Sequence, residues 1–493
     1  MSEHVEVPVY ALGQPSKRTG LGGLSLKTTI VGGLGFLIFL VCQMAGMQKL
    51  GFLVVLPITI VVALLVSVNF AGRSVAQTVQ MTVQDMRRRS KGEHIYVAGP
   101  TSRVPGGRYR LPGTLARTEL LGSVDALDNE FGVIYDKPRR EATVLFDCQM
   151  SGQTAMTQEE RNDMTANWGR WLAGLSLSGD VVSAVTVINN RPGTGDLVAK
   201  EVAATVKDDA PWIARQIQFE AAQELSYGTP ELEAHIAVTF KVNVSSGDDI
   251  SFLDFLGTRL PALYEDLAWA GIQASPMDEA MVCARAHKFF NPASESDFEE
   301  LMVSGVDHSL EWEDVGPAWH QTDRTMYHHD NCSSVTWEMS SAPRSTFEDT
   351  LLSGLVASHP RIQRKRVALC YRPYEAGTGA SRVEAEHRDA MVAANSSKKI
   401  RSAAAEMRLE HTDAARVAQA RGAQLGRYSL FVTATAAEGE LLERVRHDVQ
   451  QLGAQANLRL RPMKTQQDAG FIASCGLGQI PWSKESTSSL ASA

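Results

Sequence analysis

Two long apolar runs near the N-terminus dominate the hydrophobic pattern of the chain. Residues 28–47 read TTIVGGLGFLIFLVCQMAGM and residues 51–70 read GFLVVLPITIVVALLVSVNF, and neither run contains a charged residue. At a rise of about 1.5 Å per residue, a helix of roughly 20 residues covers the ~30 Å hydrocarbon core of a bilayer. Only Gln48, Lys49 and Leu50 separate the runs. The pattern therefore predicts an antiparallel transmembrane helical hairpin over residues 28–72.

The charges beside these runs predict their orientation. The turn carries Lys49 alone, whereas basic residues flank both outer ends: Lys17, Arg18, Lys27, Arg73, Arg87, Arg88, Arg89 and Lys91. Because cytoplasmic flanks are enriched in Lys and Arg, we expect a two-span protein of the cell membrane. Both termini are then cytoplasmic, and residues 1–27 form a cytoplasmic arm. A cleavable signal peptide is the alternative for the first run, but a second run follows it directly.

Residues 73–112 are predicted to connect the membrane part to the soluble part, because turn-forming residues recur along them. These residues are Gly92, Gly99, Pro100, Pro105, Gly106, Gly107 and Pro112. The basic cluster at 87–91 has two interpretations. It either contacts anionic lipid headgroups or is the flank that stops translocation after the second span.

The next stretch predicts a first cytoplasmic α+β domain over residues 113–245. Two short runs, FGVIYD at 131–136 and ATVLFD at 142–147, flank a turn-like KPRRE and predict a β-hairpin. Apolar residues then recur at helical spacing: Met164, Trp168, Trp171, Leu172 and Leu175. We expect the two tryptophans to pack in the core rather than to stack on a ligand. The remaining predicted elements are a strand near 184–188, helical segments at 195–226 and a strand at 234–242.

A second cytoplasmic α+β domain is predicted over residues 246–478, followed by a flexible tail at 479–493. Alternating apolar residues mark strands at 335–339 and 367–371, with a helix near 347–355 between them. The elements that follow are the strand YSLFVTATA at 428–436, a helix ending near Gly453 and the strand NLRLRP at 457–462. This order of strand-helix-strand, strand-helix-strand is the split pattern of ferredoxin-like folds.

Residues 380–424 interrupt the second domain and predict an inserted helical hairpin, because they are rich in Ala, Arg, Glu and Met and contain no proline. Charges of both signs run along the segment, so it is either a solvated helix pair or a partner-binding arm. The fold class predicted from these patterns is α+β. It comprises an N-terminal transmembrane helical hairpin and two ferredoxin-like-type α+β units, the second with the helical insertion.

Composition and charge narrow the classes of function. The net charge of −8 and pI near 5.9 argue against direct nucleic-acid binding, which needs a clustered positive field. Six cysteines are scattered without a CxxC pair, so neither a zinc site nor a redox motif is predicted. We expect them to be buried small apolar residues in a reducing compartment.

The sequence contains no recognisable motif for catalysis. Gly193-Thr194-Gly195 and Gly476-Leu477-Gly478 come nearest to a P-loop, but neither leads into Gly-Lys-Ser or Gly-Lys-Thr. A GxSxG elbow and an HExxH helix are also absent from the sequence. We therefore predict no catalytic, cofactor-binding or metal-binding residues, no cofactor and no enzymatic activity.

One cluster in the sequence has the residue types of metal ligands. Its members are His308, His320, His328, His329, Asp330 and Cys332. Adjacent histidines in a strand point to opposite faces, so His328 and His329 are poorly placed to bind one ion together. The expected structure is a polar loop before the strand that begins at residue 333.

Short motifs occur in a fixed order around the two apolar runs. Tyr10, Gly13 and Arg18 precede GLGGLSLKT at 20–28. Past the spans come LPGTLARTELL at 111–121, GVIYD at 132–136 and WGRWLAGL at 168–175. In order and length these motifs resemble an uncharacterised actinobacterial family of integral membrane proteins encoded beside conjugation-type secretion ATPases.

A second resemblance concerns residues from about 320 to 478. Their strand, helix, strand, inserted helical pair, GRYSLFVTATA and closing GLGQIP are similar to the N-terminal domain of VirB/TrbE-class ATPases of type IV secretion. In those ATPases a RecA-like motor with a P-loop comes next. The present sequence ends at Ala493, so the resemblance implies a chain that does not hydrolyse ATP. The hairpin is similar to the small VirB/PrgI-type membrane subunit that partners such ATPases.

These resemblances imply a non-enzymatic, membrane-anchored scaffold of a secretion or conjugation apparatus, similar to type IV secretion, that docks a separate ATPase at the cytoplasmic face. The expected partners are the lipid bilayer, the secretion ATPase and other membrane subunits, in an oligomeric machine. Two alternatives remain open. The EccE component of type VII secretion also has two N-terminal spans before a cytoplasmic α/β domain, and neighbouring genes would separate the two systems. A membrane-tethered enzyme would require a pocket with convergent titratable groups.

Overall fold

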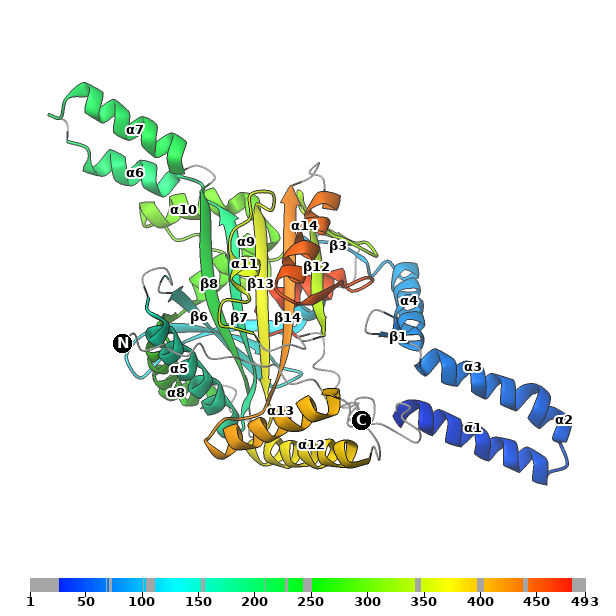
Figure 1. Cartoon of the computed structure of the whole chain (residues 1–493). Coiled ribbons are helices and arrows are strands. Elements are labelled where there is room, and N and C mark those ends of the chain that lie inside the picture. The colour runs from blue at the N-terminus through cyan, green and yellow to red at the C-terminus, as the bar shows by residue number, and fades with distance from the viewer. Residues whose placement is uncertain are drawn as a thin grey trace. The chain divides into compact units, whose positions relative to one another are not determined.

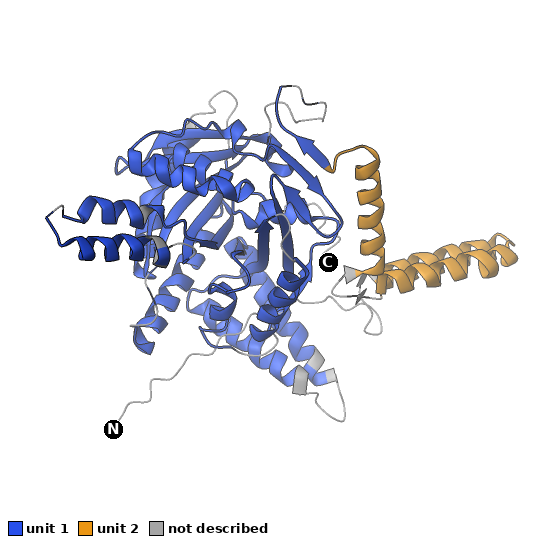
Figure 2. Cartoon of the chain, turned by 90° about the horizontal axis from the view of Figure 1, so that it is seen from above, with its two compact units in different colours: residues 1–12, 95–339, 343–479 blue, residues 13–94, 340–342, 480–493 orange. Residues whose placement is uncertain are grey.

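The computed structural model divides the chain into two compact units, which Figure 2 distinguishes by colour. The described residues of one unit lie within 13–94, 340–342 and 480–493, and those of the other within 95–339 and 343–479. The structure describes residues 26–67, 69–70, 73–100, 102, 111–150, 152, 156–207, 209–226, 229–242, 251–341, 347–396, 403–437 and 442–480. Most of the predicted N-terminal arm (1–27) and of the predicted tail (479–493) lies outside the described residues.

The smaller unit begins with a pair of apolar helices. They are α1 (Leu26–Met44) and a helical stretch formed by α2 (Gln48–Leu50), the π-helical turn η2 (Gly51–Val55) and α3 (Leu56–Ser67). The two stretches lie side by side (Figure 1), with Phe39 and Phe52 in edge-to-face contact at 5.0 Å. The contact is close at Gly35, where an added Cβ would lie 2.1 Å from Thr59 Cγ2.

One helical stretch among the described residues is long and apolar enough to cross a membrane, namely Gln48–Ser67. Only 6% of its most apolar stretch is buried inside the protein. The apolar part of α1, Thr28–Met44, is shorter than this criterion requires. One candidate span is weak support for two spans, so the transmembrane hairpin stays a prediction.

The predicted connector at 73–112 contains elements that its Gly and Pro content does not indicate. After the short strands β1 (Asn69–Phe70) and β2 (Arg73–Ser74), residues Val75–Ser90 form the helix α4. Its start is fixed by a capping box, because Gln77 N donates to Ser74 Oγ at 3.2 Å and Ser74 N to Gln77 Oε1 at 3.1 Å. The turn-forming residues all follow this helix, and the role of residues 73–112 as a connector stays a prediction.

The larger unit is built on a 13-stranded, largely antiparallel sheet with helices packed on it (Figure 1). This confirms the mixed α+β class. Eleven strands follow in order β3 (Ile95–Val97), β10 (Trp319–Thr322), β11 (Tyr327–His329), β12 (Cys332–Ser341), β14 (Gly426–Ala437), β13 (Arg364–Pro373), β7 (Val181–Pro192), β8 (Pro230–Lys241), β6 (Glu141–Met150), β5 (Glu130–Asp136) and β4 (Thr118–Val124). Two further strands lie off this path: β9 (Ile272–Pro276) pairs with β6, and β15 (Arg459–Pro462) with β12.

The central strands form two halves with the same connectivity. In the first half β6, α5 (Gln158–Leu177), β7, β8, α8 (Ser251–Trp269) and β9 give the sheet order β9-β6-β8-β7. In the second half β12, α11 (Ser353–Val356), β13, β14, α14 (Leu442–Gln455) and β15 give the equivalent order β15-β12-β14-β13. The halves meet where β7 pairs with β13, from Ala184↔Tyr371 to Asn190↔Lys365.

Each half carries a helical hairpin between two strands that pair with each other. The hairpin between β7 and β8 consists of α6 (Asp196–Thr205) and α7 (Trp212–Ser226). The hairpin between β13 and β14 consists of α12 (Ala376–Ser396) and α13 (Ala403–Ala420). The two hairpins project from opposite ends of the sheet (Figure 1). The helical insertion predicted at 380–424 is confirmed, and the helical segments predicted at 195–226 are its counterpart in the first half.

The remaining elements cover the sheet. They are η3 (Gly113–Arg117), α9 (Glu279–Phe290), η5 (Pro292–Ser294), α10 (Glu295–Ser304), η6 (Trp312–Asp314) and α15 (Gln467–Ser474). One apolar core lies under α5 and α8 in the first half, and another under α14 in the second. Trp171 is buried in the first core and stacks on Trp168 at 5.0 Å, as predicted. Cys148, Cys283, Cys370 and Cys475 are buried, whereas Cys42 and Cys332 are only partly so.

Several local predictions differ from the structure. The helix expected near 347–355 is one short turn, Ser353–Val356, although Leu355 is buried as its pattern requires. Gly453 lies inside α14 rather than at its end, and an added Cβ there would lie 2.6 Å from Leu460 Cδ1. His328 and His329 are part of strand β11 rather than of a loop.

The predicted limits of the two cytoplasmic domains, 113–245 and 246–478, stay a prediction. Both fall within the larger compact unit and share one sheet. Because β9 (Ile272–Pro276) pairs with β6, the strand contacts of the first half extend beyond residue 245.

Candidate functional site

The predicted ligand-like cluster is separated by strand geometry. His328 lies on one face of β11, with Nδ1 at 2.8 Å from Ser333 Oγ and Nε2 at 3.1 Å from Asp323 Oδ2. His329 lies on the other face, where Nδ1 donates to the Phe290 carbonyl at 2.5 Å and Nε2 lies 2.8 Å from Ser334 Oγ. The prediction that the two rings point apart is confirmed.

The contacts of His328 join a serine, a histidine and an aspartate, a set that sequence spacing did not indicate. Ser333 lies directly across from His328 in the antiparallel β11–β12 pair, and its side chain is buried at 7% exposure. A buried hydroxyl on a paired strand gives a substrate carbonyl little access, whereas a nucleophilic serine must be reached by substrate. We interpret the set as a cross-strand contact.

Of the other cluster members, His320 pairs across from His329, and both rings contact Tyr327, at 5.1 and 5.2 Å. His308 Nε2 lies 2.9 Å from the Ala280 carbonyl, and the His320 ring stacks on Tyr96 at 5.1 Å. Asp330, at φ 46°, accepts a hydrogen bond from Trp319 N at 3.2 Å. The structure therefore does not bring the cluster together around one point.

The glycines nearest to a P-loop pattern serve backbone packing. Gly476 and Gly478 follow α15 with φ of +66° and +80°. A Cβ on Gly476 would lie 2.8 Å from His235 Nε2, and one on Gly478 would lie 2.0 Å from Thr143 Oγ1. These glycines bring the backbone onto the sheet rather than around a phosphate.

A buried arginine lies beneath this segment. Arg366 of β13 donates from Nε and Nη2 to Ser474 Oγ at 3.2 and 3.1 Å. Its guanidinium lies over the rings of Phe289 and Phe471 at 4.3 and 4.9 Å. Burial lowers the pKa of Arg366, and no ion pair joins it to a carboxylate among the described residues. The aromatic faces supply the favourable electrostatics that a counter-ion would otherwise give.

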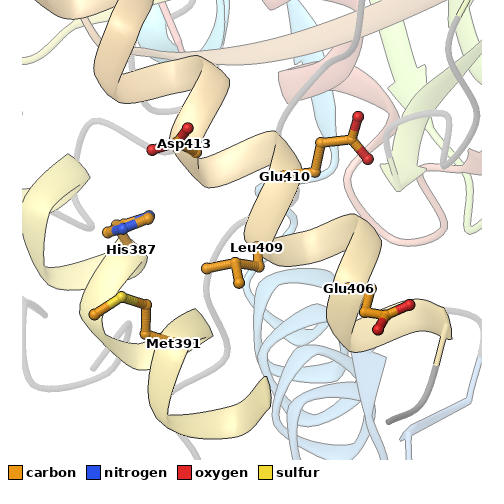
Figure 3. A pocket seen from close by; sticks show the side chains of 6 residues that line it. All are labelled: His387, Met391, Glu406, Leu409, Glu410 and Asp413. Atoms are coloured by element: carbon orange, nitrogen blue, oxygen red, sulfur yellow. The ribbon is translucent and has the colours of Figure 1, made fainter. Parts of the chain in front are cut away.

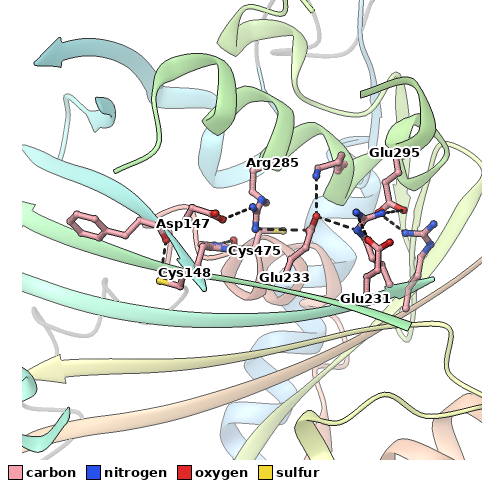
Figure 4. A network of polar contacts seen from close by, with 12 residues as sticks. Asp147, Cys148, Glu231, Glu233, Arg285, Glu295 and Cys475 are labelled. Atoms are coloured by element: carbon pink, nitrogen blue, oxygen red, sulfur yellow. Dashed lines mark hydrogen bonds and ion pairs between the residues drawn. The ribbon is translucent and has the colours of Figure 1, made fainter. Parts of the chain in front are cut away.

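A second polar network connects the sheet to α9 and α10 (Figure 4). Glu233 of β8 lies at its centre and contacts Arg191 at 3.1 Å, Lys288 at 3.2 Å and Arg285 at 3.9 Å. Burial alone would raise the pKa of Glu233, but these three cations outweigh it and hold the pKa at about 2. Glu233 is therefore ionised throughout the physiological range.

The same network fixes the base of the α6–α7 hairpin. Arg191, near the end of β7, also contacts Glu231 at 2.6 Å and Glu299 of α10 at 2.8 Å. Thr194, two residues before α6, donates a hydrogen bond to Glu299. Several carboxylates and cations that neutralise one another in this way are typical of a structural junction rather than of an open catalytic site.

The α12–α13 hairpin, termed the arm below, contributes little to the core of the sheet. Its helices are held together by Arg416–Glu384 at 3.0 Å and by His387 Nδ1 at 3.3 Å from Thr412 Oγ1. Between them lies a groove of about 360 Å³ (Figure 3). The groove is lined by His387, Met391, Glu406, Leu409, Glu410 and Asp413. Met391 and Leu409 form the apolar part of the groove, and Glu406, Glu410 and Asp413 form its acidic part.

Large apolar side chains are exposed on both hairpins. On the arm they are Met391, Val392, Met407 and Val417. On α6–α7 they are Val198, Trp212, Ile213, Ile217 and Phe219. Trp212 is 67% exposed and Val392 is 68% exposed. The apolar exposure on α6–α7 was not predicted from the sequence.

Comparison with known proteins does not assign the chain to a family. No protein-family model matches this chain, and no curated protein matches it.

Proposed function

We propose that the protein is a non-enzymatic, membrane-anchored component of a secretion or conjugation apparatus of the type IV kind. In this role it holds a separate ATPase at the cytoplasmic face of the membrane. The observation that carries the proposal is the exposed apolar stretch Gln48–Ser67, of which 6% is buried. Leaving this much apolar surface in water is costly, so the stretch needs a bilayer around it.

The architecture of the larger unit supports the second half of the proposal. We infer two ferredoxin-like units, and the repeated sheet orders β9-β6-β8-β7 and β15-β12-β14-β13 support this inference. The resemblance to the N-terminal domain of VirB/TrbE-class ATPases concerns the second half, residues of about 320–478, with the helical pair α12–α13 inserted between β13 and β14. We infer that this unit takes the place of that domain in the assembled machine.

The arm is the proposed docking surface for the ATPase. It stands on the ends of β13 and β14, where Tyr374 N donates to the Leu425 carbonyl at 3.0 Å. This hydrogen bond closes the hairpin below the helices, so the sheet does not depend on the arm for its pairing. The exposed Val392 and the acidic part of the groove offer apolar and charged contacts to a partner.

The test is a deletion of residues 380–424, bridged by a short Gly/Ser linker, in the full-length chain expressed with its native neighbours. We expect unchanged membrane localisation and loss of most ATPase from affinity purification. The α6–α7 hairpin offers a matched control, because Gly193 N donates to the Thr229 carbonyl at 2.7 Å at its base. Deletion of residues 196–226 should leave the ATPase bound.

Three outcomes would contradict parts of this proposal. Retention of the ATPase by the arm deletion would exclude the arm as the docking surface. Co-purification of a type VII motor with small WxG-type substrates would instead favour the EccE-like alternative. ATP hydrolysis by the purified full-length chain alone would contradict the non-enzymatic role.

A further inference from the structure

Helix α4 exposes apolar side chains on its solvent-facing side. Val79, Val83 and Met86 follow at spacings of four and three residues, so they lie on one face of the helix. They are 54%, 41% and 62% exposed. The buried side lies roughly a third of a turn around the helix and carries Asp85, which is 6% exposed. This is the reverse of the pattern by which a helix packs on a soluble core, where apolar residues are inside.

Basic residues border the exposed apolar face. Arg87 and Lys91 follow Met86 by one and five residues, which places them at one edge of the same face. Arg87 is exposed and forms no ion pair with the described residues, and Lys91 contacts Glu93 at 3.7 Å. The acidic Asp85 is paired with Arg89 at 3.1 Å on the buried side. The exposed face is therefore apolar in its middle and positive at its edge.

The position of α4 brings this face next to the proposed membrane span. Seven residues separate Ser67, the end of α3, from Val75, the start of α4. Figures 1 and 2 both show α4 running across the direction of the α1 and α3 pair rather than continuing along it. A helix that crosses the direction of a transmembrane pair at its end lies parallel to the membrane surface.

We propose that α4 is an interfacial helix that lies on the cytoplasmic leaflet. Its side chains Val79, Val83 and Met86 enter the boundary between headgroups and acyl chains, and Arg87 and Lys91 contact anionic headgroups. The inference rests on the membrane anchorage proposed above. In this position α4 adds an electrostatic contact with lipid headgroups to the contact made by the apolar span. The chain then leaves the span along the membrane surface.

The experiment reads the depth of single residues in the full-length protein. Cys42 and Cys332, the two partly exposed cysteines, are replaced by alanine and serine so that they do not take up the fluorophore. The other four cysteines are buried and are kept. Three variants then carry one environment-sensitive fluorophore each: Met86→Cys on the proposed lipid face, Gln84→Cys on the exposed polar side of the same helix, and Leu64→Cys in the apolar stretch. The proteins are reconstituted in phosphatidylcholine with about one third phosphatidylglycerol, with and without brominated acyl chains.

We expect bromine quenching and a blue shift at positions 86 and 64 but not at 84. Omitting phosphatidylglycerol, or combining Arg87→Gln with Lys91→Gln, should shift position 86 toward water. The ratio of bound to detached α4 should fall about fivefold for each basic residue removed. Removing the same charge with Arg408→Gln and Arg421→Gln in the arm should leave the signal at 86 unchanged.

The control positions separate this inference from the anchorage on which it rests. If position 64 is quenched while 86 behaves like 84, the chain is anchored but α4 does not lie on lipid. A signal at 86 that is shielded from water yet not quenched by brominated lipid means that a protein surface covers α4, which overturns the proposal. Absence of quenching at 64 overturns the anchorage itself.

Discussion

The buried face of the sheet keeps two histidines neutral. His235 of β8 lies at 0% exposure with Nε2 at 3.1 Å from the Cys475 carbonyl, and His329 of β11 is also fully buried. Burial, together with the nearby cations Arg285 at His235 and Arg366 at both rings, lowers the pKa of each imidazole to about 3. In the unfolded chain the same histidines have an ordinary pKa near 6.5 and bind a proton below that pH.

The first prediction follows from this difference in pKa. As the pH falls from 7 to 5, both histidines become protonated in the unfolded state but stay neutral in the folded state. Each ring should therefore lower the free energy of unfolding by about 2 kcal/mol over this pH range. The variant His235→Gln keeps a donor for the Cys475 carbonyl and removes the titration. Urea unfolding in detergent should then show about 2 kcal/mol less loss between these pH values. An unchanged loss would mean that His235 is protonated in the fold.

A second residue-scale prediction concerns Arg191. Its guanidinium contacts Glu231, Glu233, Glu295 and Glu299, so Arg191→Met would leave four partly or fully buried carboxylates without their shared cation. We expect a loss of about 3–5 kcal/mol in the free energy of unfolding, the usual effect of breaking a buried ion pair. Arg416→Met, which removes exposed pairs on the arm, should cost less than about 1 kcal/mol. Equal losses would contradict the assignment of Arg191 to a structural junction.

For single residues, the sequence predicts the face of a strand on which a side chain lies better than the residues that it contacts. The alternation of a strand is enough to place His328 and His329 on opposite faces. The contact of His328 with Ser333 depends on the register of β11 against β12, and that of His235 with Cys475 joins positions 240 residues apart. Such contacts are set by tertiary packing, which no local pattern contains.

Among the elements, those with a strong apolar period were predicted and those without one were not. The β5–β6 hairpin, α5 and the arm lie where their patterns indicate. Helix α4 was not predicted, because its apolar residues lie on an exposed face rather than against the core and its sequence is rich in Gln, Thr and Arg. The turn at Ser353–Val356 was expected to be longer, because the spacing of Phe347, Leu351 and Leu355 fits a helix that the chain does not complete.

A prediction at the scale of elements contrasts the arm with α15. Deleting residues 380–424 should change the melting temperature by only a few degrees, because β13 and β14 remain paired along their length. Ending the chain at Lys464 removes α15 and with it Phe471 and Cys475, which are fully buried against the sheet. Loss of several buried side chains exceeds the usual stability of a domain. Circular dichroism should show that the second variant does not fold, and a folded variant would place α15 outside the core.

For the whole molecule, the arrangement of the halves is a feature that the sequence only partly revealed. The repeated strand and helix order was visible in the hydrophobic pattern. The junction between the halves was not, because both β7 and β13 read as ordinary buried strands. Their pairing makes one sheet of what the sequence predicts as two domains at 113–245 and 246–478. Two halves that share backbone hydrogen bonds should unfold together.

The last prediction uses this continuity and the strand β3. A fragment of residues 95–480 contains β3, which covers the edge of β10 through the pairs Tyr96↔His320 and Val97↔Trp319. We expect it to be soluble without detergent and to unfold in one transition whose calorimetric and van't Hoff enthalpies agree. A fragment beginning at residue 113, the predicted start of the first domain, lacks β3 and leaves β10 as an open edge.

An open edge strand is a template for pairing with a second chain, so the shorter fragment should aggregate at concentrations where the longer one is monomeric. Tyr96→Ala in the longer fragment is the matched control, because it removes the stacking on His320 but keeps the backbone pairing. It should be less stable yet remain monomeric. Two separate unfolding transitions in the longer fragment would show that the halves behave as independent domains despite their shared sheet. Aggregation of both fragments would mean that the unit depends on the membrane part or on a partner for its solubility.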